Sequence, residues 1–257
     1  MTRILLTQLA VIVIYMTAWY LVARALTRFD VADIAWGPGF IISAFTAAVA
    51  VSERLNPRDY LVMAIVIIWG MRLSLHVYLR NRGKPEDARY RTWRQEWGKN
   101  ANIRAFFQVF LLQGLLLHVI SLPITSVMMA GSSAFTLWDA AGLFIWTTGF
   151  LFEAIGDWQL LRFKKDPAQK GRIIKTGLWR YSRHPNYFGE VTLWWGMYLI
   201  ALSSGASWPV IIGPLTITFL ILKVSGIPML EKKYEGNPEF EEYRQRTSAF
   251  FPLPPKS

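Results

Sequence analysis

The sequence predicts an all-α, polytopic integral membrane protein with about seven transmembrane helices, and three observations carry this prediction. Hydrophobic residues make up 53% of the 257 residues, and the chain has 12 Trp, a composition too apolar and aromatic for an ordinary soluble domain. Apolar runs of about 20 residues recur, the length that crosses a hydrocarbon core of roughly 30 Å. The basic residues gather in alternate loops between these runs, as in proteins that follow the positive-inside rule.

The apolar runs can be taken in order along the chain. The first lacks a small-residue cleavage site and leads through "LVARALTRFD" straight into charge, so it is predicted to be an anchor helix and not a removed signal peptide. Before the fourth run, Trp93 and Trp97 are spaced i, i+4 in a basic loop, which suits a short amphipathic helix in the membrane interface. The predicted spans are residues 4–23, 33–52, 60–79, 105–129, 138–157, 188–204 and 207–225.

The net charge of +11 follows this topology. Most of the 28 Lys and Arg lie in the loops 24–30, 80–104 and 158–187 and in the tail after residue 226, which places the N-terminus outside and the C-terminus in the cytoplasm. Topology and contact with anionic membrane lipids explain the basicity, so no nucleic-acid partner is predicted. We expect a multi-pass membrane protein with its polar loops and tail on the cytoplasmic side and the oligomeric state left open.

No linker or long soluble block interrupts the chain, so residues 1–257 are predicted to form one membrane domain. The tail "IPMLEKKYEGNPEFEEYRQRTSAFFPLPP" is predicted to contain a charged helix that breaks near Gly236-Asn237-Pro238, and its proline-rich end can fold back over a cytoplasmic pocket. The chain has no Cys, which excludes disulfides, thiolate catalysis and cysteine-ligated metals. Its three His form no HxxH or HxxxH pair, so no metal site is predicted.

Ionisable residues inside the predicted spans indicate a polar site, since each costs about 2.5 to 3.5 kcal/mol on insertion scales and usually faces protein or water. Glu153 and Asp157 are spaced i, i+4, so both carboxylates lie on one helix face, with Lys164 on about the same face. These residues could belong to a structural hydrogen-bond network or to a ligand site, and the sequence leaves both interpretations open. In a ligand site, the carboxylates would accept hydrogen bonds from ribose hydroxyls or an amide while Lys164, Lys165 and Arg172 hold phosphates, a mixture that fits a nucleotide.

The segment "LWRYSRHPNYFGE", residues 178–190, has the same polar character in front of an apolar run. If a helix begins near Pro185, which is tolerated in a first turn, Asn186 and Glu190 are i, i+4 neighbours at a helix N-terminus, which itself attracts negative charge. Anchoring in the membrane interface explains the aromatic and basic residues, but it leaves Asn186 and Glu190 unexplained. The candidates in this segment are Trp179, Arg183, His184, Asn186, Tyr187 and Glu190.

Motifs in the second half of the chain resemble the membrane steroid 5-alpha reductase family. "GRIIKTGLWRYSRHPNYFGE", "LEKKY" and "FFPLPP" carry the resemblance over about residues 150–257, which would form the cofactor-binding part, and "NRGKP" at 81–85 is similar to the family's NRGRP loop. The likeness is to a bacterial-type branch of the family, which implies a bacterial inner membrane and a cofactor site that faces the cytoplasm. It implies seven transmembrane helices and an oxidoreductase that uses cytosolic NADPH to reduce a carbon–carbon double bond conjugated to a ketone in a steroid-like or other lipid substrate.

The resemblance also implies which residues contact NADPH, and most of them coincide with the polar residues above. Glu153 stands where the steroid enzymes have an asparagine and Lys164 where they have an arginine, changes that keep an acceptor and a donor. Similarity to the sterol reductases adds His184, Tyr187 and Tyr234. The predicted cofactor-binding residues are Arg82, Lys84, Glu153, Asp157, Lys164, Arg172, Trp179, Arg183, His184, Asn186, Tyr187, Glu190 and Tyr234.

The first half of the chain, where the family has its catalytic residues, differs from the family's sequence pattern. The family's proton-donating tyrosine on the third helix falls on Gly70, and its glutamate on the second helix has no clear counterpart. Asp33 and Tyr78, with His76, are the candidate replacements, because an acid must deliver a proton as the hydride arrives at the β-carbon. The substrate and the proton donor stay open.

Two other functions are open. Isoprenylcysteine carboxyl methyltransferases, which use S-adenosylmethionine, share an RHPxYxG motif and a charged tail with an aromatic-proline end, and "RHPNYFG" fits that pattern equally well. The NRGKP loop and the number of cations favour the reductase, since NADPH brings three phosphate groups whereas S-adenosylmethionine carries a positive sulfonium. The third function is non-enzymatic lipid binding or transport, which predicts that no nucleotide binds.

Overall fold

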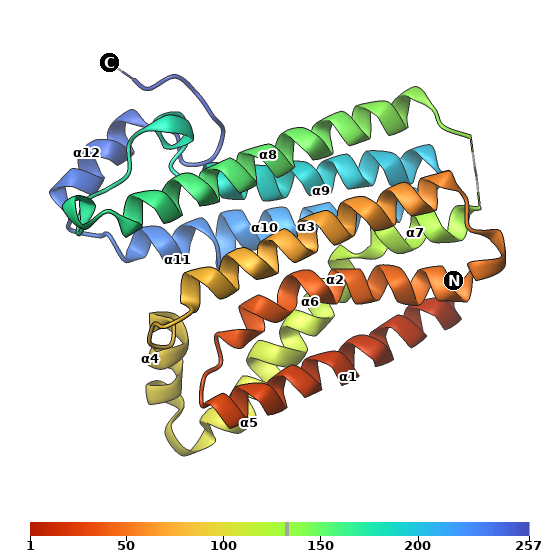
Figure 1. Ribbon diagram of the computed structural model, residues 1–257, viewed down its shortest axis with the longest axis horizontal. Coiled ribbons are helices and arrows are strands. Elements are labelled where there is room, and N and C mark those ends of the chain that lie inside the picture. Colours follow the sequence, from red (N-terminus) through yellow and green to blue (C-terminus); the bar gives the residue numbers. More distant parts are fainter. Residues whose placement is uncertain (132–133, 257) are drawn as a thin grey trace. The chain divides into compact units, whose positions relative to one another are not determined.

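The computed structural model describes residues 1–131 and 134–256, and every regular element among them is a helix (Figure 1). The predicted all-α class is confirmed. Contacts within the chain divide it into two compact units, which we describe separately. The N-terminal unit consists of Met1–Phe135 and Ser204–Ile212, and the C-terminal unit of Thr136–Ser203 and Gly213–Ser257.

Among the described residues, five helical stretches are long and apolar enough to cross a membrane, which confirms a multi-pass membrane protein. They are Thr2–Leu26, Val31–Ala50, Pro57–Asn81, Ala88–Ile120 and Trp208–Lys232. The predicted spans 138–157 and 188–204 correspond to α8 (Leu137–Lys165) and α9 (Pro185–Ser203), which are not among these five. Both helices are long enough, but their Gly, Trp and carboxylate residues lower the mean hydropathy. Helix composition therefore supports five spans, not the predicted seven.

Three long helices form the body of the N-terminal unit (Figure 1). α1 (Thr2–Leu26) packs against α2 (Val31–Ala50), and α2 packs against α3 (Pro57–Asn81). α6 (Leu112–Ile120) contacts α1 and α2, while α7 (Leu122–Ala130) contacts α2 and α3. These contacts bury one side of each helix and leave apolar side chains on the outer side, as expected of helices that face lipid.

A short connecting region separates α3 from α6. It contains α4 (Ala88–Trp97), α5 (Ala101–Ala105) and a π-helical segment, Phe106–Leu111. The predicted amphipathic helix corresponds to α4, in which the rings of Trp93 and Trp97 stack with their centroids 5.7 Å apart. Arg94 lies over the ring of Phe29, with its guanidinium carbon 3.8 Å from the ring centroid. The basic and aromatic residues of this loop therefore pack locally within the N-terminal unit.

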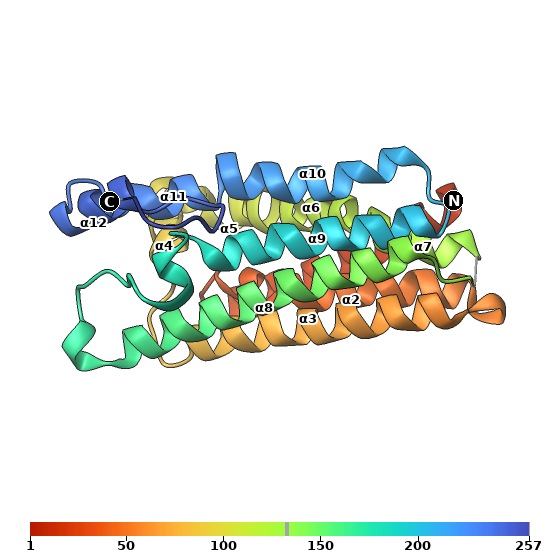
Figure 2. The same ribbon diagram turned by 90° about the horizontal axis from the view of Figure 1, so that it is seen from above.

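α8 and α9 form an antiparallel pair that dominates the C-terminal unit (Figure 2). Glycines allow the two backbones to approach closely. A Cβ added at Gly149 would lie 2.4 Å from the backbone N of Leu193, and one added at Gly189 would lie 2.3 Å from the backbone N of Glu153. Neither position tolerates a side chain unless a helix moves, as in small-residue helix contacts of membrane proteins. The same contact recurs seven residues along each helix, at Gly142 and Gly196.

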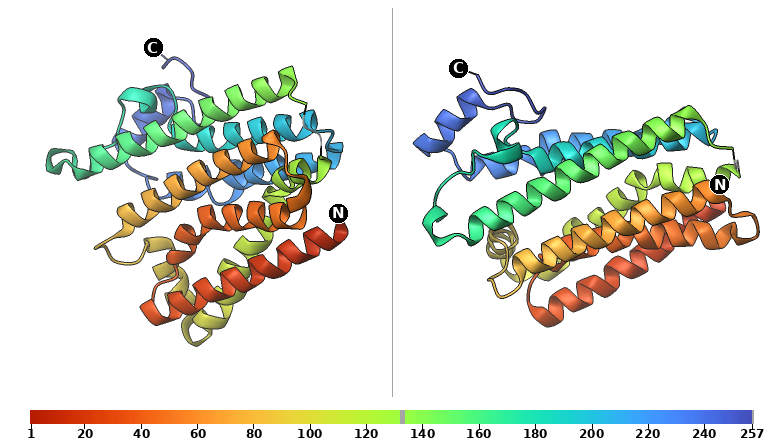
Figure 3. Two further views of the ribbon diagram at one scale, coloured as in Figure 1. Left: turned by 45° about the vertical axis from the view of Figure 1, so that its right-hand side comes forward. Right: turned by 45° about the horizontal axis from the view of Figure 1, so that its top comes forward.

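The remaining elements of the C-terminal unit are short. They are α10 (Ile212–Phe219), a π-helical segment (Leu220–Val224), α11 (Ile227–Lys232) and α12 (Pro238–Arg246). The predicted break in the tail is confirmed, because α12 starts at Pro238 after Asn237, whose side chain accepts a hydrogen bond from the N–H of Glu239 (2.9 Å). The connection 166–184, α11, α12 and the tail 247–256 gather at one end of this unit, and we call them the lobe (Figures 1 and 3).

Candidate functional site

The connection between α8 and α9 is fastened to the end of α8. Trp179 lies in a short helical turn and is buried, and its indole Nε1 donates a hydrogen bond to the carbonyl oxygen of Gly156 (3.1 Å). Beside it, the backbone N–H of Leu178 donates to the side-chain oxygen of Gln159 (3.0 Å). Trp179, a predicted cofactor contact, therefore holds the connection against α8.

Arg183 is buried and forms hydrogen bonds with several segments of the lobe. Its guanidinium donates to both carboxylate oxygens of Glu231, at 2.8 and 3.1 Å, and to the backbone carbonyls of Arg244 and Thr247, at 3.1 and 2.5 Å. Its own backbone N–H donates to the carbonyl oxygen of Ser248 (2.8 Å). A buried ion pair is stable only when its remaining donors are also satisfied. Arg183 thus ties the start of α9 to α11 and to the chain around the end of α12.

His184 continues this network but keeps one nitrogen without a partner. Its Nε2 lies 3.0 Å from a carboxylate oxygen of Glu231, and its ring stacks on that of Tyr187 with centroids 5.6 Å apart. Its backbone N–H donates to the Ser182 hydroxyl (3.1 Å), which in turn donates to the carbonyl oxygen of Phe250 (2.8 Å). Nδ1 is buried and has no hydrogen-bond partner among the described residues. Such an atom is costly to leave unpaired and marks a place where a ligand can bind.

The tail folds back on the turn that precedes α9, as the sequence predicts. The backbone N–H of Leu253 donates to the carbonyl oxygen of Tyr181 (2.9 Å), and the ring of Phe250 meets that of Phe188 with centroids 5.6 Å apart. The hydroxyl of Tyr243 on α12 donates to the carbonyl oxygen of Trp179. Burial raises the pKa of Tyr243 above its usual value, so this hydroxyl stays a donor at physiological pH.

Two predicted cofactor residues from different helices meet where α8 and α9 face each other. The side-chain amide nitrogen of Asn186 donates to a carboxylate oxygen of Asp157 (3.0 Å). Glu153 is one turn away on the same buried face of α8, as its spacing predicts. The side-chain amide oxygen of Asn186 is buried and has no hydrogen-bond partner within the described part of the chain. The site therefore offers carboxylates and a free amide acceptor.

The other predicted cofactor residues of this unit lie on α8, on α9, on the connection between them and after α11. Lys164 is exposed near the end of α8, and Arg172 is exposed on the connection after it. Glu190 is half-buried on α9. Tyr234 follows α11, and its ring stacks on Phe240 with centroids 5.1 Å apart. Among the described residues, no group of three or more His, Asp and Glu side chains could hold a metal ion.

The candidates in the N-terminal unit have separate surroundings. Arg82 and Lys84 are exposed on the loop after α3. Asp33 on α2 forms an ion pair with Arg89 (3.0 Å) and accepts a hydrogen bond from the hydroxyl of Tyr90 (2.5 Å). Tyr78, the other candidate acid, is 46% exposed on α3. Tyr90 is a partner of Asp33 that the sequence did not single out.

Gly70 explains why the family's tyrosine has no place on α3. A Cβ at Gly70 would lie 2.7 Å from the carbonyl oxygen of Gly37 on α2, and a Cβ at Gly37 would lie 2.2 Å from the carbonyl oxygen of Gly70. The two backbones cross at this pair. A tyrosine at position 70 would force α2 and α3 apart, so any acid must come from another position.

Glu231 is the residue of this region that sequence reasoning missed. It lies within "LEKKY", a motif of the resemblance, but 48 residues separate it from Arg183. The available signal was general: an arginine at the entrance to an apolar helix requires a carboxylate partner. The sequence offered several carboxylates in the tail and no local spacing to choose among them.

Comparisons with known proteins give a family and one distant relative. A family described as "Protein of unknown function (DUF1295)" matches residues 19–247. An uncharacterised protein of Schizosaccharomyces pombe, C594.04c, is 29% identical over an alignment that covers 77% of this chain and 65% of the relative. The chain thus spans just under two-thirds of that relative's length. No solved structure matches the chain.

Proposed function

The chain belongs to the DUF1295 family, and from that premise we propose that it is a membrane-embedded reductase that uses NADPH. The family is related to steroid 5-alpha reductase-like proteins, the proteins that the sequence motifs resemble. In the proposed reaction, a carbon–carbon double bond conjugated to a ketone is saturated in a steroid-like or other lipid substrate. NADPH would supply the hydride, and a side chain of the protein would supply the proton.

The cluster of Asp157, Asn186 and Glu153 is the observation that carries this proposal. The side-chain nitrogen of Asn186 donates a hydrogen bond to Asp157, and this bond fixes the orientation of the side chain. The side-chain oxygen is left as a buried acceptor. The nicotinamide carboxamide has an N–H that could fill it, and the carboxylates could accept from a ribose hydroxyl. The cluster lies on helices that also carry apolar side chains, which suits a hydride transfer to a lipid.

In the proposal, some cations of this unit bind the phosphates of NADPH and others shape the pocket. Lys164 and Arg172 are exposed and would hold the phosphates near water. Arg183 and His184 are bound to Glu231, so they would form the wall of the pocket and hold its shape. The free Nδ1 of His184 is the atom of that pair that could still reach a ligand.

A ligand comparison tests the function directly. Thermal stabilisation of the purified protein by NADPH should exceed that by S-adenosylmethionine when each is present at the same multiple of its physiological concentration, because only a ligand that binds the folded state stabilises it. The reverse ranking would assign the protein to the methyltransferases. Stabilisation by neither, together with stabilisation by lipids, would favour the lipid-binding or transport function.

Glu190→Gln tests the pocket, because it keeps the size of the side chain and removes its charge. We expect folding to be nearly unchanged and NADPH binding to weaken by about 1.5 to 3 kcal/mol, the range for hydrogen bonds to charged groups. The matched control is Glu235→Gln, an exposed carboxylate between α11 and α12. If Glu190→Gln bound NADPH normally but lowered the melting temperature markedly, Glu190 would be a structural partner.

We also propose that α8 and α9 cross the membrane as a pair, which gives seven spans with the N-terminus outside and the C-terminus cytoplasmic. Their close glycine contact supports this arrangement, because it buries the less apolar faces against each other. The chain has no natural Cys, so single cysteines at Glu53 and Lys170 can be labelled in intact cells. Labelling from opposite sides is expected, whereas labelling of both from outside would show that the pair does not cross.

A further inference from the structure

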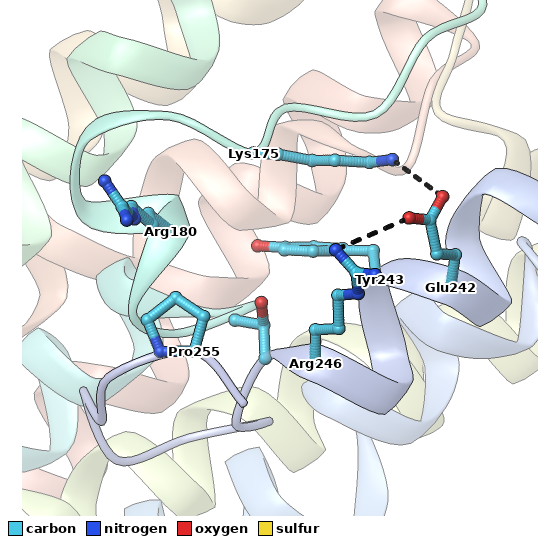
Figure 4. Close-up of a pocket in the computed structure, with 7 residues that line it drawn as sticks. Lys175, Arg180, Glu242, Tyr243, Arg246 and Pro255 are labelled. Carbon is cyan, nitrogen blue, oxygen red and sulfur yellow. Dashed lines mark ion pairs between the residues drawn. The ribbon is translucent and has the colours of Figure 1, made fainter. Parts of the chain in front are cut away.

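The lobe contains a cavity of about 140 Å³ that none of the predicted cofactor residues lines (Figure 4). Its walls come from the connection before α9, from α12 and from the tail. The lining residues are Lys175, Arg180, Glu242, Tyr243, Arg246, Thr247 and Pro255. Three of these side chains are cations and one is a carboxylate, so the cavity favours an anion.

The ion pairs at the cavity are loose. The ammonium of Lys175 lies 3.4 Å from a carboxylate oxygen of Glu239 and 3.9 Å from one of Glu242. A guanidinium nitrogen of Arg246 lies 3.9 Å from the other oxygen of Glu242 (Figure 4). Glu242 and Arg246 are largely exposed, and such surface pairs contribute little to stability. A bound anion could therefore replace Glu242 as the partner of both cations.

Arg180 adds a cation that the fold does not use. It is exposed, and its side chain has no ion pair or hydrogen bond to other described residues. Arginine binds phosphate well, because its planar fork of donors matches two phosphate oxygens. With Arg180, the cavity has more positive charge than its own carboxylates neutralise.

The tail, which supplies part of the cavity wall, also carries exposed apolar side chains. Phe251 and Leu253 in the tail are 62% and 54% exposed. Leu253 is held next to Arg180, since its backbone N–H bonds the carbonyl oxygen of Tyr181, which is itself 42% exposed. A free phosphate has no apolar part that could pack against such side chains, whereas the acyl chains of a lipid would gain from this contact.

A short stretch of chain joins α12, which lines the cavity, to a segment that can cross a membrane. The apolar stretch Trp208–Lys232 is long enough to cross a membrane, and α12 starts at Pro238, only a few residues further on. An extended chain of that length reaches at most about 22 Å. α12 therefore stays within reach of lipid headgroups at the end of this span.

We propose that this cavity binds the phosphate group of an anionic membrane lipid, with Arg180, Arg246 and Lys175 around the phosphate and the lipid chains against Phe251 and Leu253. The inference does not depend on the proposed reductase function. It assigns the tail and α12 a second task, the recognition of a lipid that is not the substrate.

The test measures binding of phosphatidic acid and phosphatidylcholine to the full-length protein in detergent by native mass spectrometry. The wild-type protein should bind phosphatidic acid at least 10-fold more tightly than phosphatidylcholine. Arg180→Met combined with Arg246→Met should reduce this preference to less than 2-fold. The control combines Arg244→Met on the same helix with Lys232→Met, both exposed and outside the cavity, and should keep the preference. Equal losses in both double variants would overturn the proposal, because they would reflect general charge.

Glu242→Gln gives a change in the opposite direction. It removes the carboxylate that competes with the phosphate for Lys175 and Arg246, so phosphatidic acid should bind several-fold more tightly. A purely structural role of Glu242 predicts no gain. Unchanged or weaker binding by a folded Glu242→Gln protein would contradict the proposal.

Two further arms distinguish a lipid from a soluble phosphate. Phe251→Ser with Leu253→Ser should weaken phosphatidic acid binding and leave the weak binding of inorganic phosphate unchanged. If inorganic phosphate bound as tightly as phosphatidic acid, the lipid assignment would be wrong. If NADPH competed with phosphatidic acid and lost affinity in Arg180→Met, the cavity would instead be part of the nucleotide site.

Discussion

Arg183 and Arg180 are three residues apart in the same lobe, yet they occupy opposite environments. The side chain of Arg183 is 9% exposed, makes a two-pronged ion pair with Glu231 and donates to two backbone carbonyls. Arg180 is exposed, and its side chain has no ion pair within the described residues. The difference shows that the basic residues of one short segment serve two purposes. Arg183 holds the lobe together, whereas Arg180 is available to a ligand.

Arg183→Met should produce the largest change in stability. It leaves the half-buried Glu231 beside His184 without its main partner, and breaking one side of a buried ion pair costs up to about 3 to 5 kcal/mol. Arg180→Met, the matched control, should change the unfolding free energy by less than about 0.5 kcal/mol. Thermal unfolding in detergent measures both. Equal effects of the two variants would remove the distinction between the two arginines.

A double variant sharpens the same comparison. If Arg183 and Glu231 act as a pair, Arg183→Met with Glu231→Met should cost less than the two single changes added together, because neither charge is left unpaired. Additive costs would mean that the backbone carbonyls, and not Glu231, are what hold Arg183.

Gly149→Ala should produce an intermediate change in stability. Arg183 lies just before α9, and the position of α9 depends on its close contact with α8. The new Cβ would lie 2.4 Å from the backbone N of Leu193, and overpacking of this kind costs about 1 to 3 kcal/mol. Thr147→Ala on the exposed side of α8 is the control and should be nearly neutral. A neutral Gly149→Ala would show that the pair can separate without loss.

Tyr243→Phe should produce the smallest change. It removes the hydroxyl, which donates to the carbonyl oxygen of Trp179 and, more weakly at 3.4 Å, to that of Ser182, and a hydrogen bond of this kind contributes about 0.5 to 1.5 kcal/mol. Because Tyr243 also lines the cavity, anionic lipid binding provides a second measurement. Binding should be unchanged, since the phosphate is assigned to the cations. Tyr181→Phe, which alters an exposed ring of the same lobe, is the stability control.

Local signals in the sequence predicted local structure well. Pro185 starts α9, and the break before Pro238 separates α11 from α12, because proline and glycine act through their own backbone. The shared face of Glu153 and Asp157 also follows from helical spacing alone. The partner of Arg183 could not be predicted in this way, because Glu231 reaches it only through the folding of the tail.

Two features were visible in the sequence but needed the structure for their meaning. Gly142, Gly149 and Gly156 recur every seven residues, a spacing that marks a helix contact once the opposite glycines on α9 are known. Gly70 was recognised only as a missing tyrosine, whereas its contact with Gly37 shows a crossing of two helices. In both cases the contact is between residues that are far apart in the sequence, and a local sequence pattern does not show which distant residues meet.

The distance along the chain between Arg183 and its partners also has a consequence for biosynthesis. Glu231, Thr247 and Ser248 are made 48 to 65 residues after Arg183, and a ribosome adding about 5 to 20 residues per second needs roughly 2 to 13 seconds for that length. During this interval the guanidinium has none of its final partners and must stay hydrated at the membrane surface. The lobe can therefore close only after residue 248 has been made, and a chain stalled or truncated before that point would expose an unpaired arginine that quality-control proteases could recognise.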